Sequence, residues 1–190
     1  YSTKATLISG KTGEIIAEKD FSGLATPYVQ VCNDKIVLSD WESGTAYFIN
    51  EKLEETDSYQ FEKANGAIYA STSGEKLYCF SADAGIYEVY LKTKKENILL
   101  EDKALGLYPS TKVDNTVSFA YTDKKTLLGV NATIDLETAE IETIPFEGGF
   151  YAVEKNEGVW LAKSYSDELY YIGKNTYPKT FALEEKYADA

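Results

Sequence analysis

The sequence contains no histidine, no arginine and no methionine, and the first two absences exclude several classes of function. Without histidine the chain has no Ser-His-Asp triad, no Cys-His pair and no histidine metal site. The 19 basic residues are all lysines, and 31 acidic residues bring the formal net charge to −12. Nucleic-acid binding depends on basic side chains that neutralise phosphate and recognise guanine, so we expect no nucleic-acid partner.

Cysteine is scarce, and long apolar runs and ligand-binding motifs are missing. Cys32 and Cys79 lie in apolar segments of different repeat units, so we expect two buried thiols rather than a disulfide. No run of eighteen apolar residues occurs, which argues against a membrane span. The sequence also has no phosphate-binding glycine loop and no calcium loop, so we expect no cofactor, no metal site and no catalytic residues.

What the sequence does contain is a repeat of about 40 residues. Its clearest copy is IVLSDWESGTAYFIN at 36–50, which has the pattern strand, tight turn, strand. Three weaker copies follow, and the apolar markers of the four copies are spaced 41, 40 and 42 residues apart: Leu38, Cys79, Phe119 and Leu161. One more short strand precedes each marker and another follows each hairpin. Four strands in such a unit are typical of one β-propeller blade.

We therefore predict an all-β chain of β-propeller blades, each a sheet of four antiparallel strands. A sheet without helices must bury both faces against neighbouring copies, which explains the repetition. The predicted blades span residues 27–61, 67–100, 107–146 and 150–183, with a short loop at 102–107. Residues 5–21 supply only a strand, a Lys-Thr-Gly turn and a strand, the outer half of a further blade.

This count of about four and a half blades leaves one sheet incomplete. A propeller closes its ring by pairing its first and last segments, which hides the strand edges. We expect the chain to be part of a larger propeller whose missing part lies upstream of Tyr1 and pairs with the half blade. The alternative is an open arc whose exposed ends pair with another chain.

Two kinds of segment carry a family resemblance. LISGKTGEIIAEKDF at 7–21 resembles the strand–Thr-Gly–strand element of quinoprotein-like (PQQ-like) repeats. The hairpins at 36–50 and at 132–146 (ATIDLETAEIETIPF) resemble those of YncE-like surface-layer propellers. The resemblance implies a six- to eight-bladed ring, commonly extracytoplasmic, that is used for binding or assembly. Some quinoproteins are dehydrogenases with a tryptophan docking pattern, but Trp41 and Trp160 occupy different strand positions and do not match it.

One aspartate recurs at a similar turn in each predicted blade: Asp40, Asp83, Asp123 and Asp167. Two interpretations are open. The four carboxylates could form a ring at one mouth of the channel and bind a cation or a polyamine. Alternatively, each side chain accepts hydrogen bonds from nearby backbone N–H groups of its own turn, and the repeat places such turns at the same height.

Aromatic residues are abundant, and 16 of them are tyrosines. Trp41 lies in a polar turn between Asp40 and Glu42, and it is the best candidate for an exposed side chain that anchors a partner. Tyr165 lies in a comparable turn of the last blade. For the series Tyr47, Tyr87 and Tyr170, packing between blades competes with stacking on a ligand.

We expect a non-catalytic binding or scaffold module, part of a bacterial extracytoplasmic or surface protein, that docks a protein or a small polar ligand on the propeller face. Its candidate binding residues are Asp40, Trp41, Glu42, Asp83, Asp123, Tyr165 and Asp167. The alternative is an enzyme, quinoprotein-like or dependent on carboxylates and tyrosines, with its site at the channel mouth. A deep pocket with perturbed carboxylates would favour the enzyme, and a hydrated rim would favour docking.

Overall fold

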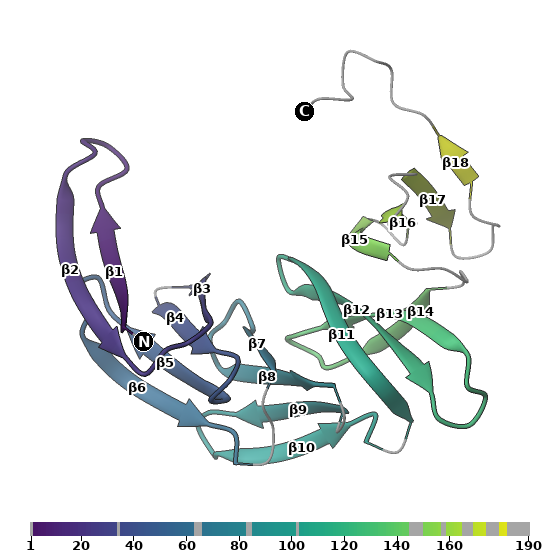
Figure 1. Ribbon diagram of the computed structural model, residues 1–190. Coiled ribbons are helices and arrows are strands. Elements are labelled where there is room, and N and C mark those ends of the chain that lie inside the picture. The colour runs from purple at the N-terminus through teal and green to yellow at the C-terminus, as the bar shows by residue number, and fades with distance from the viewer. Residues whose placement is uncertain are drawn as a thin grey trace. The chain divides into compact units, whose positions relative to one another are not determined.

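The structure is a computed structural model that describes residues 2–33, 35–62, 66–82, 85–101, 103–144, 150–156, 159–164, 169–173 and 179–181. These residues form eighteen strands and no helix (Figure 1). Their strands make one two-stranded and four four-stranded antiparallel sheets, and hydrogen-bonded neighbours are always consecutive in the chain. The chain divides into two compact units, residues 1–101 and 102–190.

The first unit contains a half blade and two complete blades. The half blade is a hairpin of β1 (Ser2–Ile8) and β2 (Ile15–Ser22). Blade one consists of β3 (Pro27–Cys32), β4 (Lys35–Asp40), β5 (Thr45–Ile49) and β6 (Glu55–Gln60). Blade two consists of β7 (Ala67–Ala70), β8 (Lys76–Ser81), β9 (Gly85–Tyr90) and β10 (Lys95–Leu99).

The second unit contains two further blades among its described residues. Blade three consists of β11 (Ala104–Val113), β12 (Thr116–Asp123), β13 (Gly129–Asp135) and β14 (Ile141–Ile144). Blade four consists of β15 (Phe150–Asn156), β16 (Val159–Ser164), β17 (Leu169–Gly173) and β18 (Lys179–Phe181). These sheets confirm the predicted all-β fold of four-stranded antiparallel blades.

One boundary prediction was wrong, because β11 begins at Ala104, inside the segment predicted as a loop at 102–107. The pairing of β11 with β12 shifts register twice, between Leu105 and Tyr108 and between Pro109 and Thr111. Such bulges interrupt the alternation of apolar and polar residues by which a strand is identified in a sequence. The buried Ala104 and Leu107 show that this bulged segment belongs to the sheet.

Tight turns between strands contain residues that tolerate a positive φ. Asn33 (φ 54°) lies between β3 and β4, and Asp114 (φ 51°) lies between β11 and β12. Asn and Asp occupy this left-handed region more readily than other non-glycine residues. In the half blade Gly13 (φ 73°) closes the turn, and its N–H donates to the carbonyl of Ser9 at 2.8 Å.

Blades one and two bury a shared core between their facing sheets. Blade one contributes buried side chains from four segments, and blade two contributes a matching set: Cys32, Val37, Ala46, Phe48 and Phe61 on one side, and Ile68, Ala70, Leu77, Cys79, Tyr87 and Val89 on the other. Both cysteines are buried here and no disulfide joins them, as predicted. Burial raises the pKa of the Cys79 thiol to about 12, so this thiol is unreactive in the folded unit.

The side-chain amide of Gln30 joins the first strands of these two blades by hydrogen bonds. Gln30 on β3 is buried, and its side-chain amide bonds to the backbone of β7. Its Nε2 donates to the carbonyl of Ile68 at 2.8 Å, and its Oε1 accepts from the N–H of Ala70 at 3.1 Å. Gln30 thereby satisfies a backbone donor and a backbone acceptor of β7, as a neighbouring strand would.

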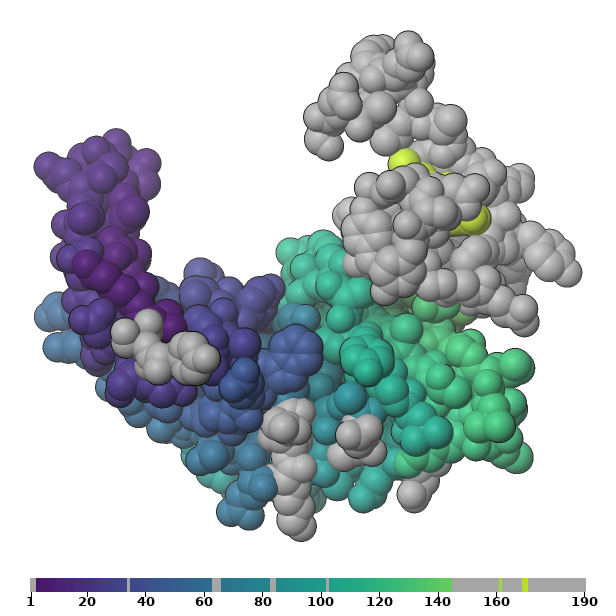
Figure 2. All heavy atoms as spheres, in the orientation of Figure 1, coloured from purple at the N-terminus to yellow at the C-terminus, as the bar shows by residue number. Residues whose placement is uncertain are grey.

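The half blade packs on the opposite face of blade one. Phe21, Leu24, Leu38, Ile49 and Leu53 form the buried cluster between them. The hairpin tip, by contrast, stands clear of the other strands of this unit (purple in Figure 2). Its residues 10–16 are all exposed. No helix of the described residues is long and apolar enough to cross a membrane.

Candidate functional site

The turn between β4 and β5 is built around the carboxylate of Asp40, the last residue of β4. Asp40 is 1% exposed. Its Oδ1 accepts hydrogen bonds from the N–H groups of Ala25 and Thr26, both at 2.8 Å, and its Oδ2 accepts from the N–H of Ser43 at 2.9 Å. The side chain therefore joins the turn to the segment that enters blade one, and both of its oxygens are engaged.

These bonds set the protonation of Asp40. Burial alone would raise the pKa of this carboxyl group, but the backbone donors of Thr26, Ser43 and Ala25 favour the charged form, and the net pKa is lowered. A carboxylate that accepts several backbone N–H groups behaves in this way. Asp40 is thus a permanently charged acceptor at neutral pH.

Trp41 follows Asp40 directly, and its backbone is also fixed. Its carbonyl accepts a hydrogen bond from the N–H of Gly66 at 3.1 Å, which ties the turn to the start of blade two. The turn closes through the N–H of Gly44, which donates to the carbonyl of Asp40 at 3.1 Å. The indole itself remains 55% exposed. A large apolar side chain is therefore presented to solvent from a rigid backbone.

Tyr28 adds a second exposed aromatic ring at the same end of blade one. Residues 27 and 28 of β3 pair with residues 40 and 39 of β4, so Tyr28 lies at the end of the sheet from which Trp41 projects. Its ring is 50% exposed and contacts Tyr69 edge-on, with centroids 5.9 Å apart. Tyr69 in turn packs against Phe80 at 5.4 Å. We call the exposed residues Tyr28, Trp41 and Glu42 the Trp41 rim.

Blade three has a turn of the same kind at Asp123. The Oδ1 of Asp123 accepts from the N–H groups of Lys125 at 3.0 Å and Thr126 at 2.7 Å, and from the Thr126 hydroxyl at 2.9 Å. These bonds lower its pKa. Beyond the turn, Leu127 and Leu128 are 71% and 62% exposed.

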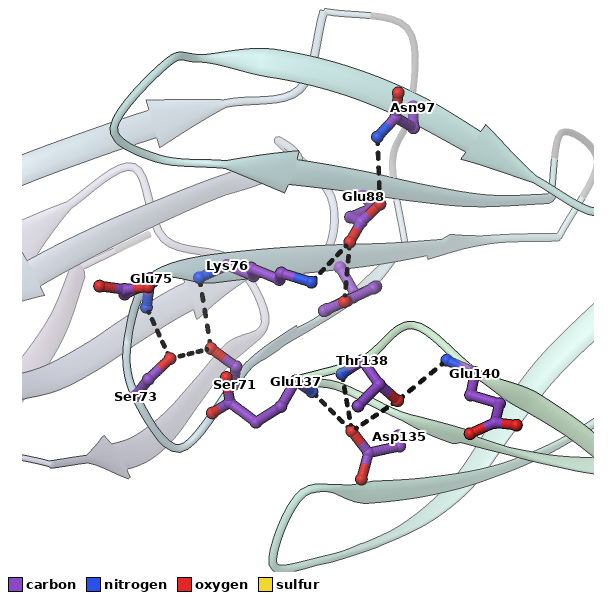
Figure 3. Close-up of polar contacts among 11 residues, drawn as sticks. Ser71, Ser73, Glu75, Lys76, Glu88, Asn97, Asp135, Glu137, Thr138 and Glu140 are labelled. Carbon is purple, nitrogen blue, oxygen red and sulfur yellow. Dashed lines mark hydrogen bonds and ion pairs between the residues drawn. The ribbon is translucent and has the colours of Figure 1, made fainter.

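Asp135, in the next turn of blade three, repeats this arrangement. Its Oδ1 accepts from the N–H groups of Glu137 and Thr138 and from the Thr138 hydroxyl (Figure 3). Asp135 is the last residue of the third strand of the blade, whereas Asp123 is the last residue of the second. The hydrogen bonds of Asp123 and Asp135 are therefore those of turn-forming aspartates, whereas Asp40 combines one such bond, from Ser43, with two from Ala25 and Thr26.

The structure describes some of the other predicted site residues. Glu42 is exposed beside Trp41. Asp83, Tyr165 and Asp167 lie outside the described residues. Within the tyrosine series, Tyr87 is buried in the core between blades one and two, Tyr47 is half-buried against the half-blade cluster, and Tyr170 is half-buried.

Two exposed features were missed in the sequence, and only one of them carries a local signal there. In the segment TLLG, Leu127 and Leu128 are consecutive apolar residues, and a strand cannot direct both to one buried face. Tyr28 precedes an alternation in which only Gln30 and Cys32 face the core. The exposure of Tyr28 depends on what lies over β3, and a single sequence carries no local signal for it.

The buried carboxylate of Glu88 in blade two is held in a network of hydrogen bonds and an ion pair, and it is not part of the Trp41 rim. Glu88 on β9 is 8% exposed and accepts from the hydroxyl of Tyr78 at 3.0 Å and from Nδ2 of Asn97 at 3.2 Å. The ammonium of Lys76 lies 3.1 Å from Glu88 (Figure 3). Burial would raise the pKa of Glu88, but these partners outweigh it and lower the pKa.

A pocket of about 280 Å³ lies at the opposite end of blade one from Trp41. Lys35 and Phe48 of blade one and Glu75 and Lys92 of blade two are among its lining residues. The Lys35 ammonium sits 5.7 Å from the centre of the Phe48 ring. Such a lining of opposite charges can hold a small polar molecule. No group of three or more acidic or cysteine side chains in the described residues is arranged to hold a metal ion.

No protein-family model matches the chain, and no curated protein is similar to it in sequence. Solved β-propellers are similar to it in structure. BamB from Moraxella catarrhalis matches with a TM-score of 0.55 and 14% identity, over 96% of this chain and 59% of that chain. A chain of a nidogen/laminin complex matches with a TM-score of 0.59 and 9% identity, over 94% and 71%.

A chain of a mitotic checkpoint complex matches with a TM-score of 0.63 and 6% identity, over 96% of this chain and 61% of that chain. The chain therefore spans about three fifths of the length of BamB and of the checkpoint protein. At these identities the likeness concerns the fold, and it shows that the sheets are β-propeller blades.

Proposed function

We propose that this chain is a binding or scaffold module that docks a protein partner on the Trp41 rim. The observation that carries the proposal is the combination of a 55% exposed indole with a fixed backbone, held by the three hydrogen bonds of Asp40 and by the N–H of Gly66. Tryptophan is among the residue types enriched at the energetic hot spots of protein interfaces. Because the backbone at Trp41 is already fixed, binding costs less conformational entropy.

The charge of the surface indicates what kind of protein surface would bind to it. Glu42 is exposed beside the indole, and the whole chain carries a formal charge of −12. A partner with an apolar pocket bordered by lysine or arginine would complement both features. Two of the similar propellers, in the nidogen/laminin and mitotic checkpoint complexes, were solved as parts of protein complexes, which is consistent with such a use of the fold.

The substitution Trp41→Ala tests the proposal. We expect it to weaken binding of a protein partner by roughly 30-fold or more, the loss that corresponds to truncation of an interface hot spot. The side chain is exposed, so its removal should leave the fold intact. Partners isolated with the wild-type chain are to be titrated against both proteins by calorimetry.

The matched control is Tyr108→Ala, which removes an aromatic ring that is 61% exposed but lies on β11 of the second unit. A partner that binds this control as tightly as the wild type, and Trp41→Ala far more weakly, supports docking on the rim. Equal affinity for the wild type and for Trp41→Ala would refute it.

We further propose that the repeats are related to quinoprotein-like and YncE-like propellers, and that the protein acts outside the cytoplasm. Support comes from the Lys-Thr-Gly hairpin of the half blade, in which the turn residue Gly13 takes positive φ, and from the compartment that is common in those families. Fractionation of the source cells tests the location. Recovery of the protein in the cytoplasmic fraction alone would contradict it.

A further inference from the structure

One hydrogen bond and one backbone conformation recur in five turns of the described residues. In each turn the N–H of one residue donates to the carbonyl of the residue four places earlier, at 2.8 to 3.1 Å. The donating residue has a positive φ of 53° to 73° in every case: Gly13, Gly44, Lys94, Leu127 and Ala139. A side chain raises the free energy of this left-handed conformation, whereas glycine adopts it without strain. Leu127 is the one large apolar residue among the five.

Leu53, in another turn, shows how burial offsets the cost of this conformation. Leu53 also has a positive φ, of 61°, but its side chain is 3% exposed and packs in the cluster between the half blade and blade one. Leu127 has almost the same φ, 59°, yet it is 71% exposed, and the next residue, Leu128, is 62% exposed. Burial within the fold therefore offsets little of the strain at Leu127. A contact that covers both leucines would remove apolar surface from water and offset it.

The turn that carries these leucines is fixed by hydrogen bonds and has a positive local charge. Besides the bonds to its carboxylate, Asp123 donates from its N–H to the carbonyl of Leu128 at 2.9 Å and accepts at its carbonyl from the N–H of Leu127 at 2.8 Å. Residues 123–129 contain two lysines and one carboxylate, and Lys125 is exposed near the leucines in the chain. We call the exposed residues Lys125, Leu127 and Leu128 the Leu127 surface.

The Trp41 rim has the opposite local charge. Residues 40–44 contain two carboxylates and no lysine, and Glu42 is exposed beside the 55% exposed indole. The rim therefore presents an aromatic ring and a negative charge on a fixed turn, and the Leu127 surface presents two aliphatic side chains and a positive charge on another. Contact between the two would bury apolar surface and bring opposite charges together.

We propose that the Trp41 rim of one copy of this chain docks on the Leu127 surface of a second copy, with Trp41 against the two leucines and Glu42 beside Lys125. The proposal names the partner of the docking site and therefore rests on the function proposed above. A second copy accounts for both surfaces with one contact, whereas a membrane would cover only the leucines. Each copy carries one rim and one Leu127 surface, so association ends in a closed dimer or continues into longer chains.

Sedimentation velocity of the 190-residue chain tests the proposal, at roughly 5 to 500 µM because a contact of a few side chains gives a weak interface. The salt is kept at about 0.15 M, which screens the repulsion between two chains of charge −12 beyond about 8 Å. We expect reversible self-association that Leu127→Gly and Trp41→Ala each weaken at least ~10-fold. Leu127→Gly also relieves the left-handed backbone, so it should not destabilise the second unit.

Charge reversal tests which side chains meet across the contact. Glu42→Lys and Lys125→Glu should each weaken self-association at least ~5-fold, because like charges then face one another. An equimolar mixture of these two variants should associate as the wild type does, since each contact between different variants again joins opposite charges. The control is Lys11→Glu, which makes the same change in net charge as Lys125→Glu at the exposed tip of the half blade. It should leave self-association unchanged.

A chain that stays monomeric at every concentration would overturn the proposal. So would self-association that survives Leu127→Gly or Trp41→Ala, or a mixture of the charge variants that stays dissociated. Binding of a monomeric chain to anionic lipid vesicles, abolished by Leu127→Gly, would overturn it by assigning the leucines to a membrane. A monomeric chain that still binds another protein through Trp41 would refute only this inference, and the docking function proposed above would stand.

Discussion

Replacement of Asp40 by alanine is expected to lower the free energy of unfolding of the first unit by about 3 kcal/mol. The carboxylate is buried and accepts three backbone hydrogen bonds, from Ala25, Thr26 and Ser43. Without it, these N–H groups lose their charged acceptor in a place that water reaches poorly. The turn that carries Trp41 should loosen as well, so the same variant should weaken partner binding.

The fluorescence of Trp41 in a Trp160→Phe background reports on the first unit during urea unfolding. The control is Asp123→Ala, which removes a similar set of turn bonds from a more exposed aspartate of blade three. Because Asp123 lies in the second unit, this control should shift the unfolding curve reported by Trp41 much less. An Asp40→Ala chain as stable as the wild type would show that the three bonds of Asp40 contribute little.

The same residue predicts a pH dependence. The pKa of Asp40 is lowered from its ordinary 3.8 in the folded state, so its charge stabilises the fold above about pH 4. This contribution is lost as the pH falls below 3.8 through the folded-state pKa. The difference in unfolding free energy between wild type and Asp40→Asn should therefore shrink as the solution is acidified below about pH 4.

Replacement of Gly66 by alanine is expected to be more damaging still, with a loss of at least about 4 kcal/mol. An added Cβ would lie 2.1 Å from the carbonyl oxygen of Phe80, a backbone atom of β8 that cannot move aside without breaking the sheet. The N–H of Gly66 would also be displaced from the carbonyl of Trp41. Blade two should separate from the turn, and the folded yield of the first unit should fall.

Gly10→Ala is the matched control for this variant. Nothing lies within 4 Å of a Cβ added at Gly10, in the hairpin tip of the half blade. Its stability should stay within about 0.5 kcal/mol of the wild type. Denaturant unfolding of both variants measures the difference in stability. A Gly66→Ala chain as stable as Gly10→Ala would contradict the prediction, because it would mean that the backbone of β8 at Phe80 can shift at little cost.

The blades could be predicted from the sequence because burial imposes a regular pattern. Leu38, Cys79 and Phe119 recur at almost constant spacing, and each is buried in the second strand of its blade. Each of these strands must fill the space between two sheets. A spacing that is repeated along the chain therefore reports directly on stacked sheets.

The roles of individual residues were harder to predict, because they depend on what lies across space. Asp40 and Asp123 each end the second strand of their blades, yet of these two only Asp40 bonds to a segment 14 and 15 residues earlier in the chain. Val29 and Ile68 are equivalent, because each lies on the first strand of its blade and pairs with a repeat marker, Leu38 or Cys79. Val29 is nevertheless 60% exposed and Ile68 only 2%. Local alternation carries no information on such coverage.

The central claim is that each blade is buried by its neighbour, and that among the described residues nothing covers Val29 and Val31 on the first strand of blade one, which are 60% and 73% exposed. The most direct measurement compares thiol labelling of Val29→Cys and Ile68→Cys in the folded 190-residue chain. The account predicts that Val29→Cys reacts almost as fast as a thiol in an unfolded peptide, while Ile68→Cys reacts only at the rate at which the unit opens. Equal rates at these two equivalent positions would contradict it.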